Sequence, residues 1–216
     1  MKKTYACLLF LLLSNISFPQ VSLRAGMGID LLSIPSLKDY INDSHIAPPD
    51  NQLGSFTTAV IFSGEADIKE ADNYEIGIEL AYLYNSYNFP TSLGPYNLTY
   101  GILMPTLTNY YIIEGQGYNF KFGGGVGIRF TNANQSLYVT NPTTYKSVGF
   151  GILLRASGNT ALSSNVFANI TGDIRYDING TPKNNGVALQ NSVANISNVN
   201  FNSFSLGLTL GITYIL

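Results

Sequence analysis

The sequence is poor in charge, in cysteine and in histidine, and it has no tryptophan. Charged residues make up 11% of its 216 residues, against about 25% in an average soluble domain. One cysteine, Cys7, permits no disulfide within the chain and is too few for a thiolate metal site. The one histidine, His45, is also too few to indicate a metal centre. We therefore expect neither a disulfide scaffold nor a bound metal.

The chain also lacks a basic surplus and a long hydrophobic run. It has 11 basic and 13 acidic residues, a balance that does not favour nucleic-acid binding. After the N-terminal region, no segment approaches the 18 consecutive apolar residues that indicate a transmembrane helix. If such a chain enters a membrane, it must do so as a closed barrel, because lipid offers no partner for unpaired backbone groups.

The N-terminus has the pattern of a secretory signal peptide. Two lysines precede an apolar segment at residues 6–13, and a more polar stretch follows it. The alternative, a transmembrane anchor, would need about 20 apolar residues. We expect residues 1–20 to be a signal peptide, cleaved within Ser17–Gln20, and residues 21–216 to form one domain. Cleavage would remove Cys7 and both lysines, leaving 9 basic residues against 13 acidic ones and a net charge of −4.

The remaining chain shows a hydrophobic period of two. In residues 206–216, large apolar residues alternate with residues such as Gly207 and Thr209. Alternate residues of a strand face opposite sides, so this segment predicts a strand with one apolar face and one small, polar face. Seven upstream segments share the alternation: residues 21–31, 56–65, 74–84, 98–113, 120–130, 148–155 and 166–176.

The connections between these segments alternate in length. The short ones are residues 67–73, 114–117 and 157–162, and the long ones are residues 35–54, 85–96, 132–144 and 179–200. Short turns at one end and long loops at the other are typical of transmembrane barrels. An even number of strands puts both termini at the short-turn end. Pro105 has no backbone N–H for a ladder, so we expect a bulge near Met104.

Residues 21–216 resemble the eight-stranded outer-membrane barrel families of the OmpA, OmpX, OmpW and opacity-protein type. The terminal strand resembles the C-terminal signal of such proteins, with Leu216 where the family usually has phenylalanine. The resemblance implies an all-β fold, an eight-stranded antiparallel up-and-down transmembrane β-barrel in a Gram-negative cell outer membrane. It also implies contact with outer-membrane lipid or lipopolysaccharide, and with the barrel-assembly machinery through the C-terminal strand. The extracellular ligand stays open.

The charges are expected inside the barrel. Eight strands enclose just enough room for side chains, which suits small and charged residues better than stacked rings. A lipocalin-like soluble barrel would instead put its apolar residues inside. Ten charged residues share the small-residue face: Arg24, Asp30, Glu65, Glu75, Glu79, Lys121, Arg129, Arg155, Asp173 and Arg175. We interpret them as an ion-pair network that fills the lumen, with a narrow polar conduit and a proton-relay or catalytic role as alternatives.

Aromatic residues near the strand ends predict a belt at each membrane interface. One expected belt contains Tyr74, Tyr110, Tyr111, Tyr118 and Tyr214, and the other contains Tyr84, Tyr87, Phe89, Tyr96 and Phe130.

Motifs for catalysis are sparse. His45 lies near Asp43 and Ser44 and could serve a lipid-modifying enzyme, but a solvated loop histidine is the plainer interpretation. The glycine run at residues 123–127 lacks the lysine and helix of a phosphate-binding loop. We therefore expect a non-enzymatic protein without a cofactor, whose long loops serve adhesion, surface protection or envelope stability. A narrow channel or transporter for small solutes is the first alternative, and a lipid-modifying outer-membrane enzyme is the second.

Overall fold

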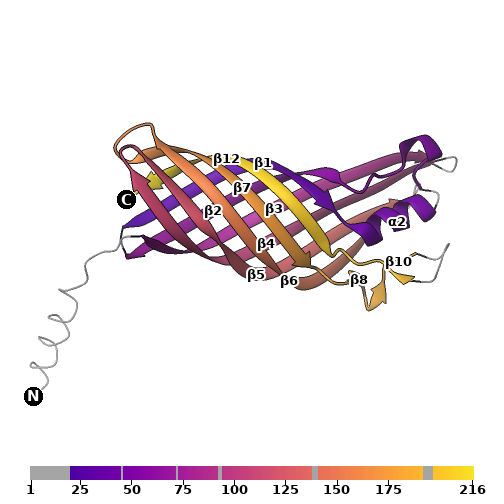
Figure 1. Cartoon of the computed structure of the whole chain (residues 1–216). Coiled ribbons are helices and arrows are strands. Elements are labelled where there is room, and N and C mark those ends of the chain that lie inside the picture. Colours follow the sequence, from indigo (N-terminus) through magenta and orange to yellow (C-terminus); the bar gives the residue numbers. More distant parts are fainter. Residues whose placement is uncertain (1–19, 45, 72, 92–93, 138–140, 192–196) are drawn as a thin grey trace, which may run out of the picture.

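A computed structural model describes residues 20–216 apart from 45, 72, 92–93, 138–140 and 192–196. Eight long antiparallel strands close a barrel in it (Figure 1). They are β1 (Val21–Ser33), β2 (Thr57–Ala71), β3 (Tyr74–Thr91), β4 (Gly94–Gly115), β5 (Tyr118–Leu137), β6 (Thr143–Ala161), β7 (Val166–Ile178) and β12 (Ser203–Ile215). Each pairs with its neighbour in the chain, and β1 pairs with β12 to close the cylinder. The expected all-β, eight-stranded antiparallel fold is confirmed. The expected signal peptide falls almost wholly outside the described residues.

The shorter elements gather at the end of the barrel opposite the termini, which we call the outer end (Figure 1). They are α2 (Pro35–Asp43), η1 (Pro49–Asn51), β8 (Lys183–Asn184), β9 (Val187–Ala188), β10 (Gln190–Asn191) and β11 (Ser197–Asn198). The β8–β9 hairpin turns through Asn185 and Gly186, whose φ angles of 45° and 85° suit the asparagine–glycine pair. Neither of the short helices among the described residues qualifies as a membrane-spanning segment.

Alternation along each strand separates an apolar outside from a polar inside. In β12, Leu206, Leu208 and Leu210 are exposed on the outer surface, whereas Ser205 and Thr209 are buried in the lumen. The same division continues around the barrel and leaves a belt of exposed leucine, isoleucine, valine and aromatic side chains. Burying such a belt in hydrocarbon is favourable and leaving it in water is costly. The expected orientation, with large apolar residues outward, is therefore the one that the structure has over most of the barrel. The first half of β4 is the exception, because its large apolar residues Leu98, Tyr100, Ile102 and Met104 face inward and are buried.

One wall of the barrel is taller than the other. The strands β3 to β6 contain 18, 22, 20 and 19 residues, whereas β1, β2, β7 and β12 contain 13, 15, 13 and 13. The expected long loops at residues 85–96 and 132–144 were therefore wrong, because most of these residues continue the strands. Inward-facing residues such as Phe89 and Tyr96 are buried there, so packing outweighs the turn-forming composition of these segments.

The expected bulge near Met104 was also wrong. On one side, β4 pairs with β3 in a single register that runs through Leu80–Pro105. On the other side, the pairs Leu103–Phe130 and Thr106–Gly127 keep the same register across the interruption at the proline. A side chain at Gly127 would clash with the carbonyl oxygen of Pro105, so the glycine lets the two strands stay aligned.

The two aromatic belts form only in part. Tyr74, Tyr111, Tyr118, Tyr214, Tyr84 and Phe130 are exposed on the outer surface. Tyr110, Phe89 and Tyr96 are buried on the inner face, and Tyr87 lies against the inner apolar cluster, so the assignment of these four to the belts was wrong. Tyr110 and Tyr111 show the reason, since consecutive residues of a strand must face opposite sides.

Candidate functional site

The ten charged residues predicted for the lumen all lie inside the barrel. None of them is more than 8% exposed. They come from β1, β2, β3, β5, β6 and β7, so the network ties together most of the circumference. Burial at this level requires partners, because an isolated charge in a protein interior is very costly.

Glu79 is the centre of the main cluster of ion pairs. Its carboxylate lies 3.2 Å from a guanidinium nitrogen of Arg24, 2.5 Å from Arg155 and 3.0 Å from Arg175. Arg155 also pairs with Glu65 at 3.2 Å and with Asp173 at 2.6 Å. The cluster spans the lumen and connects strands that are not neighbours in the sheet.

Neutral donors complete the coordination of Glu65. Its Oε1 accepts hydrogen bonds from the hydroxyl groups of Tyr110 at 2.6 Å and Thr108 at 2.9 Å. Its other oxygen lies 2.5 Å from a guanidinium nitrogen of Arg24. Charged groups that are both paired and hydrogen-bonded in this way can be retained inside a protein.

Two further groups of ion pairs lie beside the main cluster. Lys121 pairs with Glu75 and, at 2.9 Å, with Asp67. Arg129 pairs with Asp177 at 2.5 Å. Asp30 stands apart, since its carboxylate accepts a hydrogen bond from Ser205 at 3.1 Å and has no ion pair among the described residues.

Sequence reasoning missed two carboxylates and one phenol of this network. Asp67 was assigned to a turn, and Asp177 lies one step beyond the expected end of its strand. Asp67 lies two residues after Glu65 and Asp177 two residues after Arg175, so each faces the same side of its strand as a charge already assigned to the lumen. Continuing the alternation along β2 and β7 would therefore have found them. Alternation alone would not have placed Tyr110 inside, because it faces the same side of β4 as the large apolar residues Tyr100, Ile102 and Met104.

Above the ion pairs, a hydrophobic cap fills the outer end of the lumen. From α2, the side chains of Leu37 and Ile41 point into it and are 1% and 0% exposed. They join Tyr100 from the tall wall and Phe201 from the segment before β12, and the last two rings meet edge to face with centroids 5.3 Å apart. The cap therefore closes the barrel at one end with apolar side chains.

Polar groups hold the helix in the cap. Gln135 Nε2 donates hydrogen bonds to the hydroxyl groups of Tyr40 at 2.5 Å and Tyr96 at 3.3 Å. Burial raises the pKa of the Tyr40 hydroxyl. Asn42 holds the chain after the helix through paired hydrogen bonds with the backbone of Leu53, at 3.0 and 2.9 Å.

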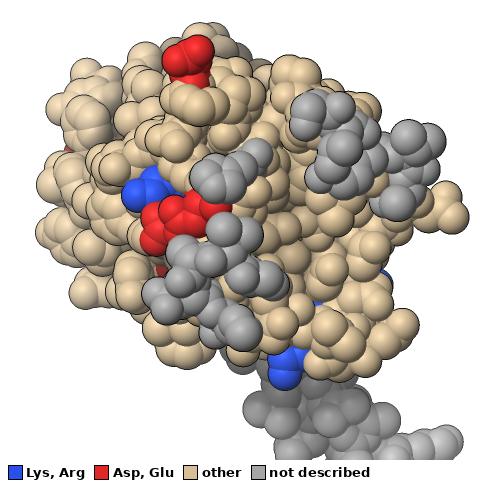
Figure 2. Space-filling model, turned by 90° about the vertical axis from the view of Figure 1, so that its right-hand side faces the viewer, with Lys and Arg blue, Asp and Glu red and all other residues tan. Residues whose placement is uncertain are grey.

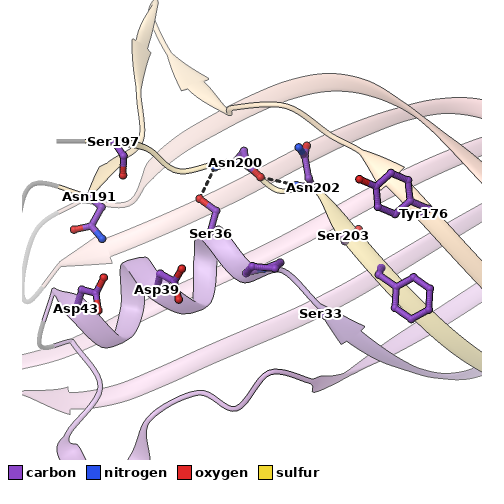
Figure 3. A pocket seen from close by; sticks show the side chains of 12 residues that line it. Ser33, Ser36, Asp39, Asp43, Tyr176, Asn191, Ser197, Asn200, Asn202 and Ser203 are labelled. Carbon is purple, nitrogen blue, oxygen red and sulfur yellow. Dashed lines mark hydrogen bonds between the residues drawn. The ribbon is translucent and has the colours of Figure 1, made fainter. Parts of the chain in front are cut away.

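A cleft of about 500 Å³ lies beside the cap, at the rim of the short wall (Figure 3). One side is α2, and the other is formed by Asn191, Ser197 and the approach to β12. Figure 2 faces the outer end, where most of the surface is uncharged and one group of acidic side chains lies beside a basic side chain. Cleft-sized concavities with a few polar groups are where ligands usually bind.

The remaining candidate residues give no second site. His45 lies outside the described residues, so the catalytic alternative that rests on it is not placed. Among the described residues, no group of three or more histidine, cysteine, aspartate or glutamate side chains could hold a metal ion.

No protein-family model matches the sequence, and no curated protein sequence matches it. Several solved structures do match this chain in their fold. Ail, the attachment invasion locus protein of Yersinia pestis, solved with the heparin analogue sucrose octasulfate, matches at a TM-score of 0.54 and 9% identity over 92% of this chain and 99% of that chain. Neisserial surface protein A matches at a TM-score of 0.51 and 13% identity, over 90% of this chain and 96% of that chain. A major outer membrane protein from Thermus thermophilus matches at a TM-score of 0.51 and 14% identity, over 92% of this chain and 100% of that chain. At such low identities the likeness concerns architecture, and the chain therefore has the fold of small outer-membrane β-barrels.

Proposed function

We propose that this chain is a non-enzymatic outer-membrane barrel that serves as a closed scaffold and presents a recognition surface at its outer end. The observation that carries the proposal is the filled lumen, with buried ion pairs along it and an apolar cap above them. What such a barrel can offer to a partner is its outer end, where α2 and the chain before β12 border the cleft. Loops on a rigid scaffold are a usual place for recognition.

The filled lumen argues against conduction, the main alternative. Glu79, Arg129 and Arg175 are at most 1% exposed, and the cap residues Ile41 and Phe201 are 0% exposed. An ion passing through would have to break several buried ion pairs and then cross an apolar plug. Leaving one member of a buried pair without its partner typically costs about 3–5 kcal/mol, so opening a path through several pairs is unfavourable.

The cleft also supports a non-enzymatic role. Its described lining contains serines and two aspartates but no histidine, lysine or cysteine. A serine nucleophile needs a base within hydrogen-bonding reach to lose its proton. The arrangement therefore suits binding better than acyl or phosphoryl transfer.

The proposed location is the outer membrane, with the termini inside and the outer end exposed to the medium. The exposed apolar belt supports lipid contact, and the exposed aromatic residues suit the two interfaces. We further propose that the β12 strand, apolar on its outer face, is what the barrel-assembly machinery binds, and that lipopolysaccharide covers part of the belt.

The location is tested by fractionation and by gel migration. We expect the protein in the outer-membrane fraction, and we expect it to migrate differently before and after boiling, because a closed barrel resists detergent at room temperature. A soluble periplasmic control should migrate identically in both conditions. Recovery of this chain in the soluble periplasm with unchanged migration would contradict the proposed location.

Conduction is tested in planar lipid bilayers. The refolded protein is expected to insert without discrete conductance steps, because the ion pairs and the cap block the lumen. A porin reconstituted in the same bilayers provides the positive control. Reproducible single-channel steps from well-folded protein would favour the channel alternative.

A further inference from the structure

The cleft at the outer end has hydrogen-bond acceptors on one side. Ser36, Asp39 and Asp43 follow one face of α2, at spacings of three and four residues, and Figure 3 shows them on the side of the helix that faces Asn191 and Asn200. The opposite face of the helix is anchored in the cap. Asp39 lies 3.3 Å from Lys38, which neutralises part of its charge, whereas Asp43 has no ion pair among the described residues.

The other side offers hydrogen-bond donors. The side-chain oxygen of Asn200 accepts from the backbone N–H of Asn202 at 3.1 Å, and that of Asn202 accepts from the N–H of Gly180 at 3.0 Å. Both amide oxygens are thus used within the fold. Each Nδ2 group keeps its two N–H donors, without a partner among the described residues. On the α2 side, the hydroxyl oxygen of Ser36 accepts from the backbone N–H of Asn200 at 3.1 Å, so the hydroxyl hydrogen of Ser36 remains to be donated.

Two rings lie at the edge of the same cleft. Tyr176 and Phe204 are directly paired across β7 and β12 and are 50% and 37% exposed. They belong to the outer surface of the barrel, at the rim of the apolar belt. The cleft therefore combines carboxylates, amide donors and an aromatic edge.

These groups discriminate among ligand classes. An anion would meet Asp39 and Asp43, whose charge would repel it. A cation would suit the carboxylates but would face the N–H groups of the two asparagines. Hydroxyl groups both donate and accept hydrogen bonds, so a ligand with several of them can satisfy both sides at once. The volume of about 500 Å³ falls within the ~300–1,000 Å³ range of small-molecule pockets.

We propose that the cleft binds an uncharged, polyhydroxylated ligand, namely one or more neutral sugar residues, with Tyr176 and Phe204 against an apolar sugar face. The sugar can belong to a free glycan or to the head group of a glycolipid, because the cleft opens at the rim of the apolar belt. This inference deepens the proposed function and rests on it, in that the outer end must face the medium.

Binding is tested with purified protein in a zwitterionic detergent without sugar, since a maltoside would compete. The probes are an array of neutral, sialylated and sulfated oligosaccharides, and nanodiscs with or without digalactosyl diacylglycerol. We expect binding to neutral oligosaccharides, to the galactolipid discs, or to both. Array binding alone would identify a free glycan, disc binding alone a lipid head group, and binding to both would show that the sugar suffices; each supports the proposal.

The variant N200D/N202D removes the four amide N–H donors but keeps the oxygens that accept backbone hydrogen bonds. It is expected to weaken neutral-sugar binding at least tenfold. The variant D39N/D43N should also weaken it, because the asparagine amide groups accept fewer hydrogen bonds than carboxylates. Asp50→Asn, at an exposed residue of η1 outside the cleft, is the matched control and should bind like the wild type.

Three results would overturn the inference. The first is that protein with heat-modifiable migration binds no neutral sugar. The second is that it prefers sulfated probes. The third is that the Asp50→Asn control loses as much neutral-sugar binding as the cleft variants. Gel migration and fractionation do not depend on the ligand, so failure of the proposed location would be seen separately from failure of sugar binding.

Discussion

Replacing Arg155 by methionine is expected to lower the free energy of unfolding by about 3–5 kcal/mol. Methionine keeps much of the side-chain length but removes the cation that contacts Glu65, Glu79 and Asp173. Three carboxylates would each lose a partner inside a lumen where Arg155 is 5% exposed. Because the chain has no tryptophan, the loss is best measured by far-ultraviolet circular dichroism and gel migration during urea titration in lipid vesicles.

Lys69→Met is the matched control. Lys69 lies 2.6 Å from Glu114 at the end of the barrel that carries the termini, with side-chain exposures of 21% and 52%. Exposed pairs of this kind contribute about 0–1 kcal/mol, so the control should unfold close to the wild type. Equal stability of the two variants would contradict the view that the lumen pairs hold the barrel together.

Introducing arginine at Val126 is expected to cost about 2–4 kcal/mol when the barrel is folded in a bilayer. Val126 is 61% exposed on β5, between Phe122 and Phe130 in the apolar belt. Placing a charge there forces either a guanidinium into hydrocarbon or a local thinning of the membrane. The measurement is the urea midpoint of unfolding from vesicles, together with the yield of heat-modifiable protein.

Val187→Arg provides the comparison. Val187 is 66% exposed, almost the same as Val126, but it belongs to the β8–β9 hairpin at the outer end. The same substitution should change stability by less than about 0.5 kcal/mol there. If both variants were equally stable in vesicles, the outer face of β5 would not be in lipid.

The sequence was sufficient for the barrel and for the charged part of its lumen. Period-two alternation identified all eight strands and put ten charged residues on one face, because a barrel of this size requires the same division on every strand. Asp67 and Asp177 were missed only because the strand ends were drawn too short. Strand ends depend on packing with distant segments, and alternation alone does not show where that packing stops.

The outer end was much harder to predict. Residues 85–96 contain prolines, asparagines and serines, which suggested a loop, yet Phe89 and Tyr96 continue the strands into the cap. The helix at residues 35–43 and the cleft beside it depend on contacts with residues more than 150 positions away, such as Asn200. Likewise, the donor role of Asn200 and Asn202 becomes visible only once their oxygens are seen to be occupied by backbone groups.

The composition of the cap also fixes an order of events during assembly. Its apolar side chains come from α2, from the first half of β4 and from the segment before β12, among others, which are early, central and late parts of the chain. In the proposed orientation, all three must cross the membrane before the cap can pack, because no two of them supply the whole cluster. Closure of the outer end therefore needs nearly the whole chain, from α2 to Phe201, and should come late in folding.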